Sequence, residues 1–179
     1  MIRRHLPALA ASAVLAVLAA CGGTSHHSSS AADAPVTAAP ATEAATTTAA
    51  PAAPPDPCTL VSQSQAAALV QTPVQAAVGA GSPPDQSCEY DAPPTGPVAQ
   101  VEIFVGDGAK KTLDIDKDNL HHAFTMPSGL GDEAYLETDD IFFRKGETWF
   151  EINVVDLDTP ADQIQSGLQT LAQQIVAKL

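Results

Sequence analysis

Residues 22–55 lack the side chains with which a hydrophobic core is built. They include twelve Ala, six Thr, five Pro and four Ser, and Val36 is their single larger aliphatic residue. A segment of this composition buries too little apolar surface to offset the entropy lost on folding. The sequence therefore predicts a disordered tether here and leaves residues 56–179 to form one folded domain.

The residues before the tether have the pattern of a secretory signal. Arg3 and Arg4 form a short basic segment, and an almost wholly apolar run follows from Leu6 to Ala20. A membrane-spanning helix needs about 20 apolar residues, and this run is shorter. We therefore expect residues 1–20 to be a signal peptide and not a retained span.

The apolar run ends in Leu18, Ala19, Ala20 and Cys21, which resemble the lipobox of bacterial lipoproteins. The resemblance implies that Cys21 becomes the N-terminus and that its thiol carries a diacylglyceryl group. Two or three acyl chains anchor a protein durably, so we expect a lipoprotein on the outer face of the cell membrane, with residues 21–55 as lipidated cysteine and tether. The alternative is soluble secretion, in which Cys21 is incidental.

The charge of residues 56–179 restricts the partners of the domain. This part of the chain has nineteen Asp and Glu against six Lys and Arg, a formal charge of −13. Such a domain repels nucleic acid, so we expect no nucleic-acid partner. It also repels anionic headgroups, so membrane association is expected through the lipid on Cys21. The 124 residues fit a single domain.

The domain has two cysteines, Cys58 and Cys88. An exported protein meets an oxidising compartment, so we expect them to form a disulfide. A redox-active pair is the weaker alternative, because the spacing is not Cys-x-x-Cys and no basic neighbour is present to activate a thiol.

Helix signals occur near both ends of the domain. Ser62 and Gln65 have the spacing of a capping box and predict a helix over residues 63–71. Thr159 is expected to cap a last helix, with Pro160 at its first position. The apolar face of this last helix is formed by residues spaced four, three and four apart: Ile164, Leu168, Leu171 and Ile175.

Apolar residues alternate with polar ones between these helices, which predicts half-buried strands over residues 99–105 and 150–154. The segments SCEYDA, from Ser87, and DEAYLE, from Asp132, are expected to be strands that pair with each other. A turn at PPTGP is expected to connect the first two strands.

Two further segments complete the expected fold. IFFRK is predicted to form a hairpin with TWFEINVV through Gly146, and residues 110–124 are predicted to be helical. Strand pairs joined by tight turns form antiparallel sheets, whose apolar face must be covered. We therefore predict an α+β fold with an antiparallel sheet of about five strands, covered by two or three helices, the C-terminal one packed on the sheet.

Several of these pieces resemble a known family, the actinobacterial lipoproteins that contain domain of unknown function 3558. The resemblance depends on DPCTLVSQSQAAALV, on the aromatic Tyr90 two residues after Cys88, on GLGDEA from Gly129 to Ala134, and on the final helix. It covers nearly all of residues 56–179. It implies an envelope lipoprotein with an antiparallel sheet flanked by helices, and it implies no catalytic residues, because that family has no established activity.

The best candidates for metal ligands are Asp114, Asp116 and Asp118, which alternate like the first oxygen ligands of a calcium loop. Asn119 stands where that loop needs Gly, and Thr125 stands where it needs a bidentate Glu. We therefore interpret the three aspartates as a solvated acidic helix face and predict no metal.

No motif for catalysis is present. The sequence has no Gly-x-Ser-x-Gly, and the domain histidines are the adjacent pair His121 and His122, which point about 100° apart on a helix. Acid pairs such as Asp139 and Asp140 are too common in an acidic chain to specify a glycosidase. We expect neither an enzyme nor a bound cofactor.

Two glycine-containing stretches are interpreted as turns. Gly129 and Gly131 are predicted to adopt positive φ and to allow a sharp turn into the following strand. Gly106 and Gly108 are separated only by Asp107, whereas a Walker loop has four residues between its glycines. We expect a hairpin or a strand-to-helix turn there.

Two functions remain open on the sequence. One is an accessory protein that docks on an envelope protein through its acidic surface or an exposed strand edge. The other is a carrier that holds a lipid or small apolar ligand in a cavity. We favour the first, because it requires no cavity. The aromatic residues available to line a cavity are Phe142, Phe143, Trp149 and Phe150.

Overall fold

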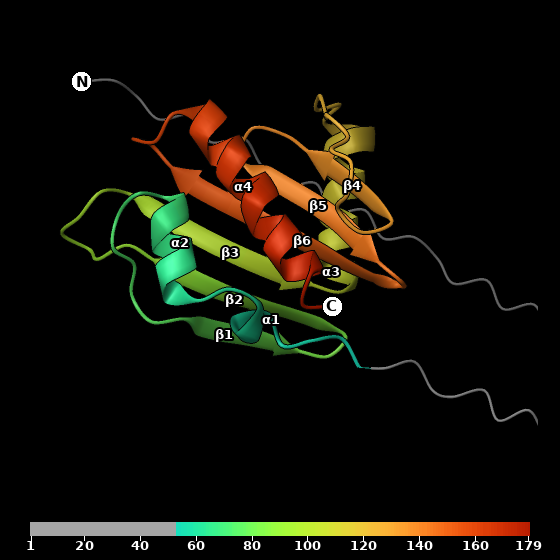
Figure 1. Ribbon diagram of the computed structural model, residues 1–179, viewed down its shortest axis with the longest axis horizontal. Helices are drawn as coiled ribbons and strands as arrows, with labels where there is room; N and C mark the ends of the chain where they lie inside the picture. The colour runs from blue at the N-terminus through green and yellow to red at the C-terminus, as the bar shows by residue number, and fades with distance from the viewer. Residues whose placement is uncertain (1–52) are drawn as a thin grey trace, which may run out of the picture. The chain divides into compact units, whose positions relative to one another are not determined.

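The computed structural model describes residues 53–179, which form an α+β fold with one antiparallel sheet (Figure 1). The strands are β1 (Val78–Ser82), β2 (Asp85–Asp91), β3 (Ala99–Val105), β4 (Glu133–Leu136), β5 (Asp140–Lys145) and β6 (Thr148–Asp156). The helices are α1 (Pro57–Leu60), α2 (Gln63–Leu69), α3 (Asp107–Asp114), the π-helix η1 (Ile115–Asn119) and α4 (Ala161–Val176). The strand order is β1-β2-β3-β6-β5-β4.

The predicted signal peptide, Cys21 and the predicted tether up to residue 52 lie outside the described residues. Within residues 53–179, no helix is both long and apolar enough to cross a membrane.

The sheet separates two layers of helices. In Figure 1, α2 and α4 lie in front of the sheet and α3 lies behind it. The larger apolar cluster, under α1, α2 and α4, includes Val101, Ile103, Phe143, Phe150 and Ile152. The smaller cluster, between α3 and the other face, consists of Ala109, Leu113, Phe142 and Trp149.

Both clusters are built from side chains between residues 58 and 176. The described part of the chain therefore contains an extensive core, and we expect residues 53–179 to fold on their own.

Local patterns in the sequence correctly predicted the central strands. β3 has the predicted bounds, and its residues alternate between fully and partly buried along its whole length. The hairpin of β5 and β6 turns at Gly146, whose φ is +61°. Both predictions are confirmed, because a tight hairpin and a period of two are properties of short segments.

The predicted partnership of SCEYDA with DEAYLE is wrong. SCEYDA lies mainly in β2, which pairs with β1 and β3, whereas DEAYLE contains β4, which pairs with β5 at the opposite end of the sheet. The sequence VGAGS of β1 was not predicted as a strand, because its small residues show no alternation. The sheet consequently has six strands where about five were expected.

The two terminal helices agree with most of their sequence signals. The Ser62 N–H donates to Gln65 Oε1 at 2.9 Å and the Gln65 N–H donates to Ser62 Oγ at 3.3 Å, so the capping box at the start of α2 is confirmed. The predicted cap at Thr159 is wrong, because Pro160 occupies the N-cap of α4, which has no side-chain cap. The predicted apolar face of α4 is buried at Ile164, Leu168, Leu171 and Ile175.

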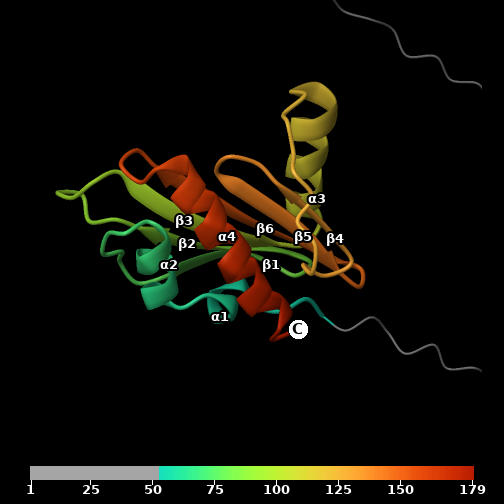
Figure 2. The ribbon, with the colours of Figure 1, turned by 45° about the horizontal axis from the view of Figure 1, so that its top comes forward.

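The middle helix was predicted over residues 110–124, and it ends earlier. It starts after Gly106, which has φ +115° at the strand-to-helix turn, and continues through α3 and η1 to Asn119. Leu120 is exposed, whereas Phe124 packs edge-on against Tyr135 and Phe142 with ring centroids 5.9 and 6.3 Å away. The chain therefore turns back toward the sheet after η1 (Figure 2).

Gly129 and Gly131 both have positive φ, as predicted for the turn before β4. A side chain on Gly131 would collide with the carbonyl oxygen of Arg144, while Gly129 faces open space. Gly131 is thus the glycine that allows the turn to approach β5 closely.

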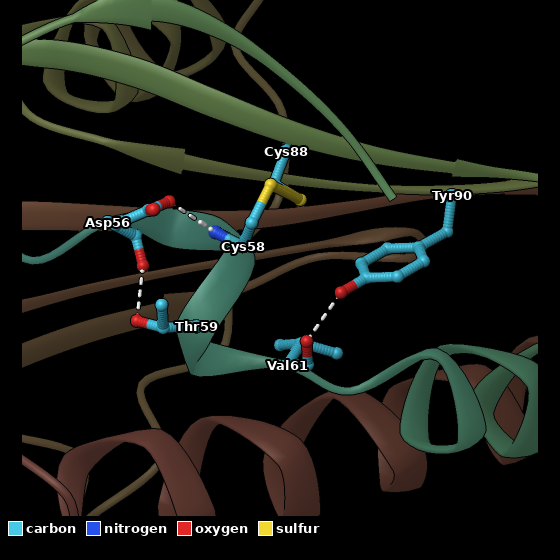
Figure 3. Close-up of a disulfide and its surroundings, with 6 residues drawn as sticks. All are labelled: Asp56, Cys58, Thr59, Val61, Cys88 and Tyr90. Atoms are coloured by element: carbon cyan, nitrogen blue, oxygen red, sulfur yellow. Dashed lines mark hydrogen bonds between the residues drawn. A yellow bond between two sulfur atoms is a disulfide. The ribbon is translucent and has the colours of Figure 1, made fainter. Parts of the chain in front are cut away.

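A disulfide fixes the start of the domain to the sheet (Figure 3). Cys58 in α1 and Cys88 in β2 are joined, with their Cα atoms 5.1 Å apart. Asp56 caps α1 by accepting a hydrogen bond from the Cys58 N–H at 2.9 Å, and the Tyr90 hydroxyl donates to the Val61 carbonyl oxygen. A covalent bond and a buried hydrogen bond therefore hold the same short segment against β2.

Removing the disulfide tests how much stability the Cys58–Cys88 bond contributes. We expect Cys58→Ser with Cys88→Ser to lower the free energy of unfolding by about 3.5 kcal/mol, because the bond closes a loop of 30 residues in the unfolded chain. Urea unfolding of residues 53–179 measures the change. Equal stability of the variant and the unreduced protein would contradict the expectation.

Candidate functional site

A group of acidic side chains lies between η1, the end of β4 and the start of β5, on the face of the sheet that α3 covers. We call this group, together with its histidine, the acidic pocket. It consists of Asp116, His122, Glu137, Asp140 and Glu151.

Three of these residues converge at the rim of the acidic pocket. His122 Nδ1 lies 2.8 Å from Glu137 Oε2 and 3.9 Å from Asp116 Oδ1, and the three side chains place one ligand atom each within 4.8 Å of one another. The turn after η1 produces this arrangement. His121 has φ +55°, and the His122 N–H then donates to the Asp116 carbonyl oxygen at 2.9 Å.

Asp140 lies deeper in the acidic pocket, at the start of β5. The sheet register places it opposite Asn153 of β6, whose side-chain amide donates to Asp140 Oδ1 at 2.7 Å. The pKa of Asp140 is raised to about 7, mainly by burial and also by the charges of Asp139, Glu137 and Asp116, against the opposing effect of the Asn153 hydrogen bond. The carboxyl is only 9% exposed.

Glu151 is the most deeply buried acid of the domain, at 3% exposure. It lies two residues before Asn153 in β6 and therefore on the same face of the sheet. Its pKa is raised to about 8, mainly by burial and also by the charges of Asp140, Asp116 and Glu102, while a hydrogen bond with Thr112 opposes the rise. Its Oε2 atom has no hydrogen-bond partner among the described residues.

The basic side chains near the acidic pocket are engaged elsewhere. Lys117 lies over the ring of Tyr135, 4.1 Å from its centroid, and Lys110 pairs with Asp114. Arg144 Nε lies 3.5 Å from Glu133 Oε2. Within residues 53–179, no lysine or arginine forms an ion pair with the carboxylates of the acidic pocket, so the imidazole of its own histidine is their one basic contact.

The hollows of the surface lie elsewhere. Five hollows of residues 53–179 have volumes between about 190 and 550 Å³, and none is lined by a residue of the acidic pocket. The largest lies between α2 and α4 and is lined partly by Gln65, Gln71, Gln163 and Gln174. The acidic pocket therefore coincides with none of these five hollows.

The three aspartates singled out in the sequence do not converge. Asp114 pairs with Lys110, Asp118 is exposed, and Asp116 turns toward the sheet. The interpretation as a solvated acidic helix face therefore fits Asp114 and Asp118, and it does not fit Asp116. No local signal could have joined Asp116 to Glu137, because the two residues come from different elements and meet only after the helix packs on the sheet.

The four aromatic residues considered for a ligand cavity belong to the core. Phe143 and Phe150 stack with ring centroids 5.0 Å apart in the larger cluster, while Phe142 and Trp149 face α3 on the other side of the sheet. They lie on two faces of the sheet and pack against other core side chains, so they do not line one cavity.

The edge strand β1 is a second feature of the surface with binding potential. It ends the sheet, all five of its residues are exposed, and none of them is charged. The opposite edge differs, because Thr125 forms a bridge with Leu136 of β4. Behind β1, Cys58 Sγ would lie 3.3 Å from a Cβ on Gly79, so the disulfide supports the strand from one side.

Comparison of the chain with protein-family models, with curated proteins and with solved structures finds no match. The resemblance to the domain of unknown function 3558 therefore stays a prediction.

The buried carboxyl of Glu151 predicts a particular dependence of stability on pH. Between its ordinary pKa of 4.5 and about 8, the folded state holds a proton that the unfolded chain releases, so stability falls as the pH rises through this window. Glu151→Gln removes this fall. We expect the variant to match the unchanged protein near pH 4.5 and to exceed its stability by about 1–3 kcal/mol at pH 8.

Urea unfolding in EDTA, at several pH values from 4.5 to 8, measures the effect. Glu147→Gln is the matched control, because it removes the same charge from the exposed turn between β5 and β6. Parallel pH profiles for the Glu151→Gln variant and the unchanged protein would contradict the expectation.

Proposed function

We propose that this protein is a lipid-anchored, extracytoplasmic docking protein without catalytic activity, and that it binds an extended segment of an envelope protein along β1. The observation that carries the proposal is the uncharged, fully exposed strand at the end of the sheet. The lipobox at Cys21 supports the anchor, and the resemblance to the lipoproteins with domain of unknown function 3558 supports the cellular location.

An exposed edge strand is a template for another strand, because its outer N–H and C=O groups have no partner in the sheet. Natural proteins usually protect such edges with charged residues, proline or bulges within the strand. The sequence VGAGS of β1 contains neither a charge nor a proline. Strand addition supplies main-chain hydrogen bonds, and the side chains of the added strand supply specificity.

Charge indicates the chemistry of the partner segment. The domain has a formal charge of −13, and Glu89 and Asp91 lie in β2, the strand next to β1. An extended segment with basic side chains at alternating positions therefore complements this edge better than an acidic one.

Two observations support a binding function over catalysis or apolar transport. The two carboxyls with the most strongly raised pKa values, Asp140 and Glu151, line none of the five surface hollows described above. The aromatic residues suited to an apolar cavity fill the core on both faces of the sheet. A docking function needs neither a substrate cleft nor a cavity.

The anchor is tested by replacing its cysteine. We expect Cys21→Ala to abolish labelling by a clickable palmitate analogue in the bacterium that produces the protein, and to remove the lipid-dependent association with membranes. Cys88→Ser is the control, because it removes a thiol of the domain and leaves the lipobox intact. Undiminished labelling of the Cys21→Ala protein would refute the anchor.

The docking edge is tested by a photoreactive amino acid at position 78, in cells of the producing bacterium. We expect a discrete covalent adduct that Ala80→Lys reduces at least tenfold, because a positive charge repels a basic segment, and that Ala80→Glu preserves. A photoreactive residue at the exposed Gln173 of α4 is the control for position. An adduct that responds equally to lysine and glutamate, or none at all, would refute docking along β1.

A further inference from the structure

We propose that Asp116, His122 and Glu137 form a binding site for a divalent transition-metal ion such as Zn²⁺, at the rim of the acidic pocket. This inference is independent of docking along β1, which lies at the far end of the sheet order from the β4–β5 edge.

The separations of the three side chains suit a small ion. The Nδ1 atom of His122 lies 2.8 Å from the Glu137 carboxylate and 3.9 Å from that of Asp116. Ligand atoms around a tetrahedral Zn²⁺, each about 2.0–2.2 Å from the metal, are about 3.3 Å apart. The two distances from His122 lie on either side of this value, and all three ligand atoms lie within 4.8 Å of one another, so small side-chain shifts bring them to one ion.

The kinds of ligand atom narrow the choice of metal. An imidazole nitrogen and carboxylate oxygens are both ligands that Zn²⁺ takes in proteins, and in sites with three protein ligands water occupies the fourth position. Calcium prefers six to eight oxygen ligands, and the imidazole supplies none. His122 is 43% exposed at its side chain, so the site faces solvent on one side and an ion can enter without unfolding.

Independent support for a cation site comes from Glu151, a buried acid of the acidic pocket. This residue is only 3% exposed, its Oε2 has no partner among the described residues, and it lies on the same face of β6 as Asn153, which holds Asp140. A buried acceptor without a donor is rare in folded proteins. A cation at the rim reduces the mutual repulsion of these carboxylates.

A bound ion would also join three parts of the chain. Asp116 belongs to η1, His122 to the turn after it, and Glu137 follows β4, where its carbonyl oxygen accepts a hydrogen bond from Gln165 of α4. The metal would therefore connect η1 and the turn after it to the end of β4. In the free protein, the contact of His122 with Glu137 adds to the packing of Lys117 on Tyr135 and to the bridge of Thr125 with Leu136.

Isothermal titration of residues 53–179 with ZnCl₂, after treatment with EDTA and removal of the chelator, tests the proposal. We expect one Zn²⁺ per chain, and at least a tenfold loss of affinity for His122→Gln. The neighbouring variant His121→Gln is the matched control and should bind Zn²⁺ unchanged. The exposed position of His122 makes this substitution compatible with folding, which circular dichroism verifies.

A second pair of variants separates this site from a calcium loop. Asp116→Asn and Glu137→Gln should each weaken Zn²⁺ binding at least tenfold, whereas Asp114→Asn and Asp118→Asn should leave it within twofold. The proposal is overturned if Zn²⁺ does not bind, or if both histidine variants weaken binding equally. It is also overturned if CaCl₂ binds more tightly than ZnCl₂ and Asp114→Asn or Asp118→Asn abolishes that binding.

Discussion

The pairing of β3 with β6 is the constraint on which the rest of the domain depends. The six strands form two groups of three, β1-β2-β3 and β6-β5-β4, and seven residue pairs between β3 and β6 join them. This register places Phe104 opposite Glu151 and Ile103 opposite Ile152. A slip of one residue would move Glu151 into the larger apolar cluster and expel Ile152 from it, so the core specifies the register strongly.

Features encoded by a few consecutive residues could be predicted from the sequence, namely the capping box at Ser62, the alternation in β3 and the hairpin at Gly146. Features that depend on distant segments could not. The wrong pairing of β2 with β4 is of this kind, because an apolar pattern identifies a strand without identifying its neighbour. The acidic pocket was missed for the same reason, since η1, β4 and β6 must assemble before its residues meet. The strand β1 was missed because its small residues carry no pattern at all.

The electrostatics of the acidic pocket follow from the layer that covers it. Glu151 and Asn153 occupy the polar positions of an alternating strand, which ordinarily face water. Here α3 packs over that face through Leu113 and Ala109, and the helix carries Glu151 out of solvent together with its apolar neighbours. Desolvation of a carboxylate is costly, which is why burial is the largest cause of its raised pKa. Packing of the smaller cluster thus holds α3 on the sheet and also raises the pKa of Glu151.

The position of the disulfide also determines how the domain bears mechanical load. The chain enters the described domain at residue 53, and five residues later Cys58 is bonded to Cys88 in β2. Tension from the preceding chain therefore passes through a covalent bond into an inner strand, which is paired on both of its edges. The force bypasses residues 59–87, which the disulfide closes into a loop and which include β1, so pulling on the N-terminal side does not peel β1 from the sheet. The disulfide thus isolates β1 from forces that act on the chain before residue 58.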